Sequence, residues 1–244
     1  MVPEDTINDF VKRVREAAEP NLESILLFGS AAAGDFHEGT SDLNLFCVLR
    51  DCSFAALQAI APATKWWERQ KQPPPLCMTR RELERSTDVF TIELLDMQQH
   101  HRVLFGDDVV QTLRISMQVH RVQVEYELRE KLILLRQQVL LAAGNPSRLW
   151  ELLLHSEPSF GTLFRHSLIA LGGTPPASRR DAVQALAKHV GFDPAPFHRI
   201  QEVREHKANP KKTDAEDIAA RYLAAIEKVT NAVDEALDSE AHRG

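Results

Sequence analysis

The chain has 244 residues, of which 43% are hydrophobic and 26% charged, and its formal net charge is −6. This length and composition are typical of a globular protein with one large domain or two small ones. The acidic balance argues against a protein that mainly binds the nucleic-acid backbone, and no apolar run approaches the ~20 residues of a membrane-spanning helix.

The amino terminus and the cysteines both favour a cytoplasmic protein. Met1–Asp5 has neither the basic start nor the apolar stretch of a signal peptide. The three cysteines, Cys47, Cys52 and Cys77, are odd in number and have no CxxC spacing. We therefore expect reduced thiols, with neither a disulfide framework nor a zinc site.

In the first half of the chain, predicted helices alternate with short predicted strands. Apolar residues recur every three or four positions from Ile7 to Ala18, which predicts an amphipathic helix. The apolar runs 24–28 and 43–49 predict strands that are buried on both faces, so helices should flank their sheet. The later predicted elements, in chain order, are a helix at 53–70 interrupted at Pro62, a strand at 76–78, a helix opened by the capping box 79–82, a helix at 89–99 and a strand at 103–105.

From residue 108 onward the pattern predicts helices only. The first is a long helix at 109–143, and the others are expected at 147–155, 159–171, 178–190, 194–207 and 213–238. The predicted fold class is therefore an α/β (α+β) domain at 1–107, with a small mixed sheet flanked by helices, followed by an all-helical bundle at 108–244. Because the apolar positions of the long helix exceed one narrow stripe, a homodimer that buries this helix is a further expectation.

One stretch has the pattern of a binding site for phosphates and metal. Leu27-Phe28-Gly29-Ser30 is followed, after eleven residues, by Asp42-Leu43-Asn44-Leu45. A glycine at the end of a strand lets backbone N–H groups approach an anion, and the serine hydroxyl adds a donor. Strand alternation places Asp42 and Asn44 on one face, and such oxygen ligands beside a phosphate-binding turn suit Mg²⁺ and a triphosphate.

This combination resembles the nucleotidyltransferases of the polymerase-β-like superfamily, in particular the minimal and kanamycin-type branches, over residues 22–107. The resemblance implies a nucleotidyltransferase domain in which Gly29 and Ser30 bind the β- and γ-phosphates of a nucleoside triphosphate, with ATP as the expected nucleotide. It also implies that Asp42 and Asn44 hold Mg²⁺ or Mn²⁺. The nucleoside monophosphate would pass to a hydroxyl of a small molecule or protein that the sequence does not identify.

The chain departs from the family pattern at two positions. Asn44 stands where the family has Asp or Glu, and an amide oxygen binds a hard cation more weakly than a carboxylate does. Cys77 stands where a third carboxylate is expected on the strand at 76–78, and a thiol is a poor ligand for magnesium. The leading hypothesis is therefore a domain that binds Mg²⁺–nucleotide, with transfer weakened or lost. An active enzyme that uses Asp42, Asn44 and Glu93 is the first alternative.

The second alternative is a helical-bundle function, as an interaction or ribonuclease module regulated by the first domain. Arg148 and His155 fit the Arg-x₆-His spacing of HEPN-type ribonucleases, in which two helical turns place both side chains on one face. Arg199 and His206 fit the same spacing equally well. Two matches in a chain rich in arginine and histidine indicate coincidence, so this alternative ranks below the others.

Overall fold

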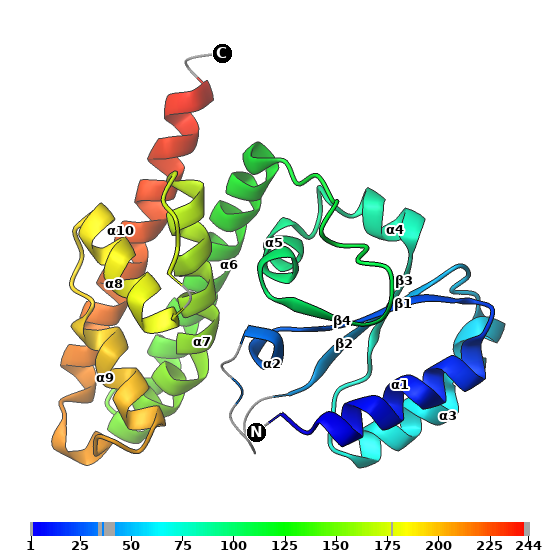
Figure 1. The fold of residues 1–244 in the computed structure, drawn as a ribbon. Coiled ribbons are helices and arrows are strands. Elements are labelled where there is room, and N and C mark those ends of the chain that lie inside the picture. Colours follow the sequence, from blue (N-terminus) through cyan, green and yellow to red (C-terminus); the bar gives the residue numbers. More distant parts are fainter. Residues whose placement is uncertain (1, 34–35, 37–41, 177, 242–244) are drawn as a thin grey trace. The chain divides into compact units, whose positions relative to one another are not determined.

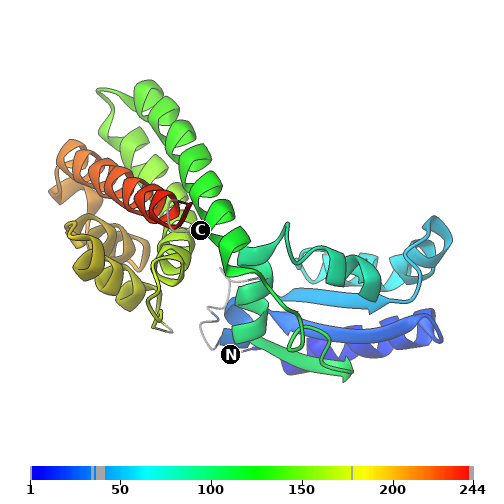
Figure 2. The same ribbon diagram turned by 90° about the horizontal axis from the view of Figure 1, so that it is seen from above.

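The computed structural model describes residues 2–33, 36, 42–176 and 178–241, and the chain divides into two compact units at 1–116 and 117–244 (Figures 1 and 2). The first unit contains a four-stranded mixed sheet with flanking helices, and the described part of the second contains helices without strands. This is the predicted fold class. The division falls after Ser116, later than the expected boundary at 107, because Val109 and Val110 are buried in a core of the first unit.

The sheet has the strand order β3-β2-β1-β4. Its strands are β1 (Leu22–Phe28), β2 (Asn44–Leu49), β3 (Leu76–Thr79) and β4 (His101–Gly106). β1 runs antiparallel to both β2 and β4, whereas β2 and β3 are parallel. The connection between the parallel strands contains the helix α3 (Phe54–Arg69), as a parallel crossover requires.

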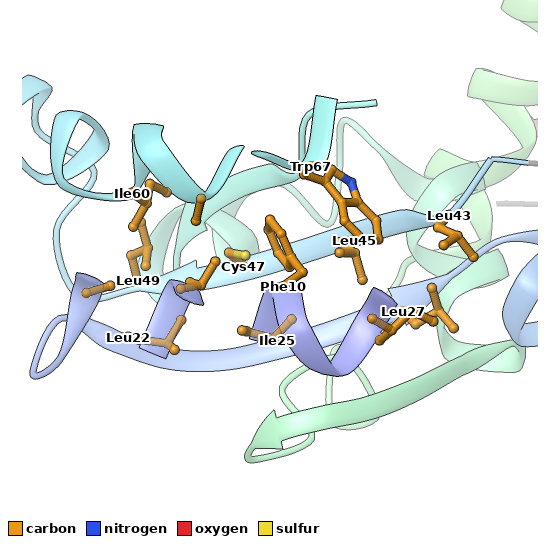
Figure 3. Close-up of a cluster of buried hydrophobic side chains, with 14 of the residues drawn as sticks. Phe10, Leu22, Ile25, Leu27, Leu43, Leu45, Cys47, Leu49, Ile60 and Trp67 are labelled. Carbon is orange, nitrogen blue, oxygen red and sulfur yellow. The ribbon is translucent and has the colours of Figure 1, made fainter. Parts of the chain in front are cut away.

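Helices cover both faces of the two central strands, which confirms the interpretation of their apolar runs. On one face lie α1 (Glu4–Ala18) and α3, whose rings Phe10 and Trp67 pack with centroids 4.7 Å apart (Figure 3). The buried residues of this α1/α3 core are Ile7, Phe10, Val14, Ala18, Leu22, Ile25, Leu27, Ala31, Leu43, Leu45, Cys47, Leu49, Ile60, Ala63 and Trp67. The interruption predicted at Pro62 is wrong, because burial of α3 on either side of Pro62 outweighs the one backbone hydrogen bond that proline removes.

On the other face of the sheet lie α4 (Arg80–Arg85) and α5 (Thr91–Gln99). The capping box predicted at Thr79 and Glu82 is present at the start of α4. The buried residues of this α4/α5 core are Leu26, Phe46, Val48, Leu83, Leu94, Met97, Val109 and Val110. Alternate residues of β2 thus belong to opposite cores, so this strand contributes to both layers of the first unit.

β4 ends at Gly106, where its backbone lies against β1. Gly106 has φ +74°, and a Cβ built on it would lie 1.9 Å from the carbonyl oxygen of Glu23. We expect Gly106→Ala to lower the free energy of unfolding of the first unit by about 2–4 kcal/mol, because overlap with backbone adds to the strain of a positive φ.

The matched control is Gly144→Ala, which has a similar φ of +72° and no atom within 4 Å of its added Cβ. It should cost only about 1 kcal/mol, the strain of the backbone alone. Urea unfolding followed by amide NMR signals of each unit measures both variants. Equal losses in the two would show that the contact with Glu23 contributes nothing.

The second unit begins with α6. Its helices are α6 (Met117–Ala142), α7 (Pro146–Ala170), α8 (Arg179–Val190), α9 (Ala195–Arg204), the short 3₁₀ helix η1 (Pro210–Lys212) and α10 (Ala215–Ala241). The start predicted for α6 at Val109 is wrong. Asp108 instead accepts hydrogen bonds from the backbone N–H groups of Val110 and Gln111, which forms a turn and directs the valines into the α4/α5 core.

Two predicted breaks in the bundle also differ from the structure. α7 continues through Pro158, although a break was predicted there. Proline cannot donate to the carbonyl four residues earlier, but the guanidinium of Arg204 donates to this carbonyl, that of Leu154, instead. α9 ends at Arg204 rather than at residue 207.

Candidate functional site

The turn after β1 brings Gly29 against Asn44. Phe28 pairs with Asn44 across the antiparallel strands, and Gly29 follows with φ +76°. A Cβ built on Gly29 would lie 3.1 Å from Nδ2 of Asn44, so only glycine fits here without displacing the amide. The carbonyl of Gly29 accepts from the N–H groups of Ala32 and Ala33 at 3.0 Å each.

Ser30 begins the short helix α2 (Ser30–Ala33) directly after this turn, and its side chain is partly exposed. Since the N–H groups of Ala32 and Ala33 already donate to Gly29, the backbone donors that α2 offers next to the serine hydroxyl are its first two, those of Ser30 and Ala31. The structure thus places the predicted phosphate-binding residues beside the predicted metal ligand Asn44.

Asn44 is the first residue of β2, and Asp42 lies two residues before it. Asn44 is partly exposed and shares its strand face with Phe46, a residue of the α4/α5 core, whereas Leu43 and Leu45 are buried in the α1/α3 core. The backbone N–H of Leu43 donates to Oε1 of Gln72 at 2.8 Å, which anchors the chain between the two polar residues. Asp42 is exposed. That Asp42 shares a face with Asn44 stays a prediction, because Asp42 precedes the first residue of β2.

Cys77 does not face this site. It pairs in register with Cys47 on the parallel strand β2 and packs against the α1/α3 core, on the opposite face of the sheet from Asn44. The hydrogen bond with Cys77 and burial both raise the pKa of the Cys47 thiol, which keeps this thiol protonated. The residues of β3 that face the side of Asn44 are Leu76 and Met78. The placement predicted for Cys77 is therefore wrong, but β3 still offers no carboxylate on that face.

Glu93 lies on α5, which covers the same sheet face as Asn44. Its side chain is exposed and lines a pocket whose other walls include Phe46 and Leu76. Phe46 is two residues after Asn44 on β2, so the pocket begins about 7 Å along the strand from the amide. Of the described residues that line this pocket, Glu93 alone carries a carboxylate.

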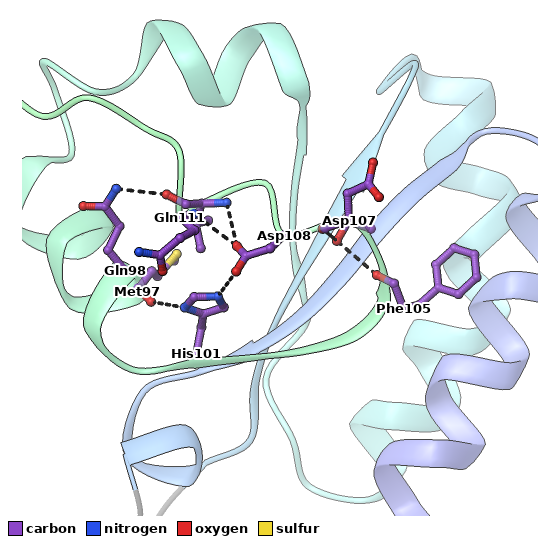
Figure 4. A network of polar contacts seen from close by, with 9 residues as sticks. Met97, Gln98, His101, Phe105, Asp107, Asp108 and Gln111 are labelled. Carbon is purple, nitrogen blue, oxygen red and sulfur yellow. Dashed lines mark hydrogen bonds and ion pairs between the residues drawn. The ribbon is translucent and has the colours of Figure 1, made fainter.

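A histidine–aspartate pair lies on the other side of the turn and was not identified from the sequence. His101, the first residue of β4, pairs with Phe28, so it is one strand away from Gly29. Its Nδ1 is 2.7 Å from the carbonyl oxygen of Met97, and its Nε2 is 3.0 Å from Oδ2 of Asp108 (Figure 4). Both partners are acceptors, so the ring satisfies both only when it carries both protons. The sequence signal was weak, because it consists only of an acid seven residues after a histidine.

Asp108 contacts His101 and also accepts hydrogen bonds from the turn before α6. Burial by itself raises the pKa of Asp108, but hydrogen bonds from His101 and from the N–H groups of Gln111 and Val110 hold it below its ordinary value. A lowered pKa means that the carboxylate stabilises the fold above about pH 4, and that this contribution is lost as the pH falls through the pKa of the folded state.

We therefore expect Asp108→Asn to lower the free energy of unfolding by only about 0.5 kcal/mol at pH 6, because the amide oxygen still accepts from the two N–H groups and only the negative charge beside His101 is lost. The difference from the wild type should shrink as the pH approaches 3.5. The neighbouring Asp107→Asn is the control, because the Asp107 side chain is 89% exposed and should contribute little. Urea unfolding at several pH values measures all three proteins, and a difference that grows toward low pH would contradict the expectation.

The described side chains form no ready-made metal site. Within the described ranges, no group of three or more His, Cys, Asp and Glu side chains is arranged to hold a metal ion. The set formed by Asp42 and Asn44 has one carboxylate and one amide, so a bound nucleotide would have to supply further oxygen ligands. In the part of the chain that the structure describes, no helix combines the length and apolar character needed to cross a membrane.

The two candidate ribonuclease pairs differ in their placement. Arg148 and His155 are both exposed on α7. Arg199 donates to Glu202 at 2.9 Å, and His206 lies beyond the end of α9 with φ +57°. The second pair therefore does not share one helix face, contrary to the prediction.

Comparisons with known proteins agree with the geometry of the first unit. Residues 7–97 match the family model described as a nucleotidyltransferase domain. Among solved structures, the chain is similar to the spectinomycin adenyltransferase AAD(9) from Enterococcus faecialis, whose crystal structure contains ATP and spectinomycin. The identity is 16%, the TM-score is 0.57, and the match covers 93% of this chain and 98% of that one. No curated protein sequence matches the chain. At this identity the structural match shows a shared fold.

Proposed function

Because this chain carries a domain of the nucleotidyltransferase superfamily at residues 7–97, we propose that the domain binds a Mg²⁺–nucleoside triphosphate, with ATP as the nucleotide. We propose further that transfer of the nucleoside monophosphate to a hydroxyl is weakened or lost. The observation that carries the proposal is the contact between the Gly29 turn and Asn44, beside an exposed Asp42.

The residues of this turn fit a metal-bound triphosphate. The missing Cβ of Gly29 leaves room that a side chain would fill, so an anion can approach the backbone N–H groups that follow. Ser30 adds a hydroxyl donor, and Asp42 supplies a carboxylate for Mg²⁺ or Mn²⁺. The metal, when bound, would neutralise phosphate charge and polarise the reacting phosphoryl group.

Two features of the site would make transfer of the nucleoside monophosphate slow. Asn44 contributes a neutral oxygen to the metal, so less of the charge of a divalent cation is compensated. On β3, Leu76 and Met78 occupy the positions on the face of Asn44, so this strand supplies no acid to coordinate a metal or accept a proton. In the alternative hypothesis, that of an active enzyme, Glu93 on α5 would accept the proton from the attacking hydroxyl.

Isothermal titration of ATP into the full chain, with and without Mg²⁺ or Mn²⁺, tests this proposal. We expect metal-dependent binding that Asp42→Ala abolishes, since the substitution removes the one carboxylate of the set. Asp9→Ala is the control, because Asp9 is also an exposed aspartate of the first unit but lies on α1, which covers the sheet face opposite to Asn44. The proposal is wrong if no metal supports ATP binding, or if Asp42→Ala binds as the wild type does.

The acceptor, the oligomeric state and the cytoplasmic location stay predictions. The solved structure of the similar protein contains ATP and spectinomycin, and only its nucleotide enters the present proposal. A homodimer would bury the exposed apolar side chains of α6, which are Met117, Val122, Tyr126, Ile133, Leu134, Leu140 and Leu141. Sedimentation equilibrium measures whether the chain forms such a dimer.

A further inference from the structure

A pocket of about 200 Å³ lies between the sheet and the helices α4 and α5. It is lined by Phe46, Leu76, Met78, Leu83, Ser86, Phe90, Glu93, Leu94 and Met97. Seven of these nine side chains are apolar. A cavity of ~150 Å³ with a comparable apolar lining stays dry and binds benzene, so this pocket has room for one six-membered ring.

Large apolar side chains are exposed at the rim of this pocket. Leu76 is 45% exposed and Phe90 41%, although both line the pocket, and the adjacent Val89 is 57% exposed. Exposed apolar side chains grouped around a concave surface are typical of a binding site, because a ligand there removes their surface from water.

The few polar groups of the pocket limit which ligand it can bind. The hydroxyl of Ser86 already donates to the carbonyl of Glu82 at 2.7 Å, which leaves the exposed carboxylate of Glu93 as the main polar partner. The ring nitrogens and amine of adenine would be left without enough hydrogen-bond partners here, and such losses are costly. A polycationic ligand would likewise meet only one negative charge.

We propose that this pocket binds the apolar ring of an uncharged alcohol, which is the acceptor class for the function proposed above. The ring fills the space between Leu76, Met78 and Met97, and the hydroxyl donates a hydrogen bond to Glu93. Phe46 of the lining shares its strand face with Asn44, so an alcohol held in the pocket would lie on the same side of the sheet as the proposed metal ligand. This assignment of the acceptor rests on the proposed function, whereas the binding of the ring does not require a nucleotide.

Methionine methyl groups provide a direct test. Two of the four methionines, Met78 and Met97, line the pocket, and Met117 lies in the second unit. In the full chain labelled with ¹³C at the methionine methyls, 2-phenylethanol should shift the NMR signals of Met78 and Met97 and leave that of Met117 in place. For a probe of this size, we expect a dissociation constant on the order of 1 mM.

Two variants with the same new side chain separate specific binding from surface adsorption. Ser86→Phe should fill the pocket and abolish the shifts, whereas Thr87→Phe, at a neighbouring residue outside the lining, should preserve them. Shifts that persist in Ser86→Phe, equal shifts of Met117, or no shift at all would each overturn the proposal.

A titration with Mg²⁺–ATP distinguishes the acceptor from the nucleobase. We expect the affinity for 2-phenylethanol to be the same or higher with Mg²⁺–ATP present, and displacement by ATP would overturn the proposal, because the base would then occupy the pocket. The NMR test is run first without nucleotide, so its failure is distinct from a failure of ATP binding in calorimetry. If calorimetry alone fails, the apolar pocket stands and the proposed function falls.

Discussion

Asn44→Asp is expected to bind Mg²⁺–ATP about 10- to 100-fold more tightly than the wild type, a change of about 1.4–2.8 kcal/mol. The substitution replaces a neutral oxygen with a charged one beside a divalent cation. Two unit charges 4 Å apart attract by about 4 kcal/mol at the effective dielectric of a protein surface, and desolvation of the carboxylate offsets part of this gain. Hydrolysis of ATP to AMP and diphosphate, in which water takes the place of the unidentified acceptor, should rise as well.

The ATP affinity of Asn44→Asp without metal is the control for this prediction. In the absence of a divalent cation, the new carboxylate repels the phosphates, so Asn44→Asp should bind ATP more weakly than the wild type. Calorimetry with EDTA and then with Mg²⁺ measures both signs in one series. Stronger binding under both conditions would mean that residue 44 acts on the fold rather than on the metal, and no change under either would exclude Asn44 from the site.

Gly29→Val is expected to weaken ATP binding about 100-fold, with or without metal. A β-branched residue at φ +76° is strained by about 1–3 kcal/mol, and the added Cβ would lie 3.1 Å from Nδ2 of Asn44. The turn can relieve this strain only by moving, which takes the following N–H groups away from the phosphates and displaces the metal ligand. Gly29→Ala should show a smaller loss of the same kind, because alanine is less bulky.

Gly172→Val is the matched control for this second prediction. Gly172 has φ +81°, and a Cβ there meets no atom within 4 Å, so the same backbone strain arises in the second unit. It should leave ATP binding unchanged. Amide NMR spectra of both variants show whether each protein is still folded. A folded Gly29→Val that binds ATP as tightly as the wild type would contradict the role assigned to this turn.

Helices that continue through a proline show where sequence reasoning failed. A proline inside a helical pattern predicts a break, but α7 in the second unit continues through Pro158 and α3 in the first through Pro62. At Pro158 the lost hydrogen bond is compensated by Arg204, which is 46 residues away in the sequence. Because such a donor comes from a distant segment, local propensity could not predict it. The predicted start of α6 is wrong for a similar reason. Val109 and Val110 are buried in the α4/α5 core of the first unit, which the local pattern does not reveal.

The site divides in the same way. Local sequence determined the turn, because a glycine after an apolar strand and alternation along the next strand predict which residues share a face, and both strands are present in the sheet with Phe28 beside Asn44. The side on which Cys77 lies depended on the register of a four-residue strand, in which a shift of one residue reverses every side chain.

The sequence by itself thus determined the fold class and the Gly29 turn beside Asn44, because both depend on periodicity and on the backbone freedom of glycine. Only the tertiary structure decided the boundary of the units, the pairing of His101 with Asp108, the direction of Cys77 and the apolar pocket at Glu93. These features bring together residues from different strands, helices and loops. Their contacts depend on strand register and helix packing, which no local pattern specifies.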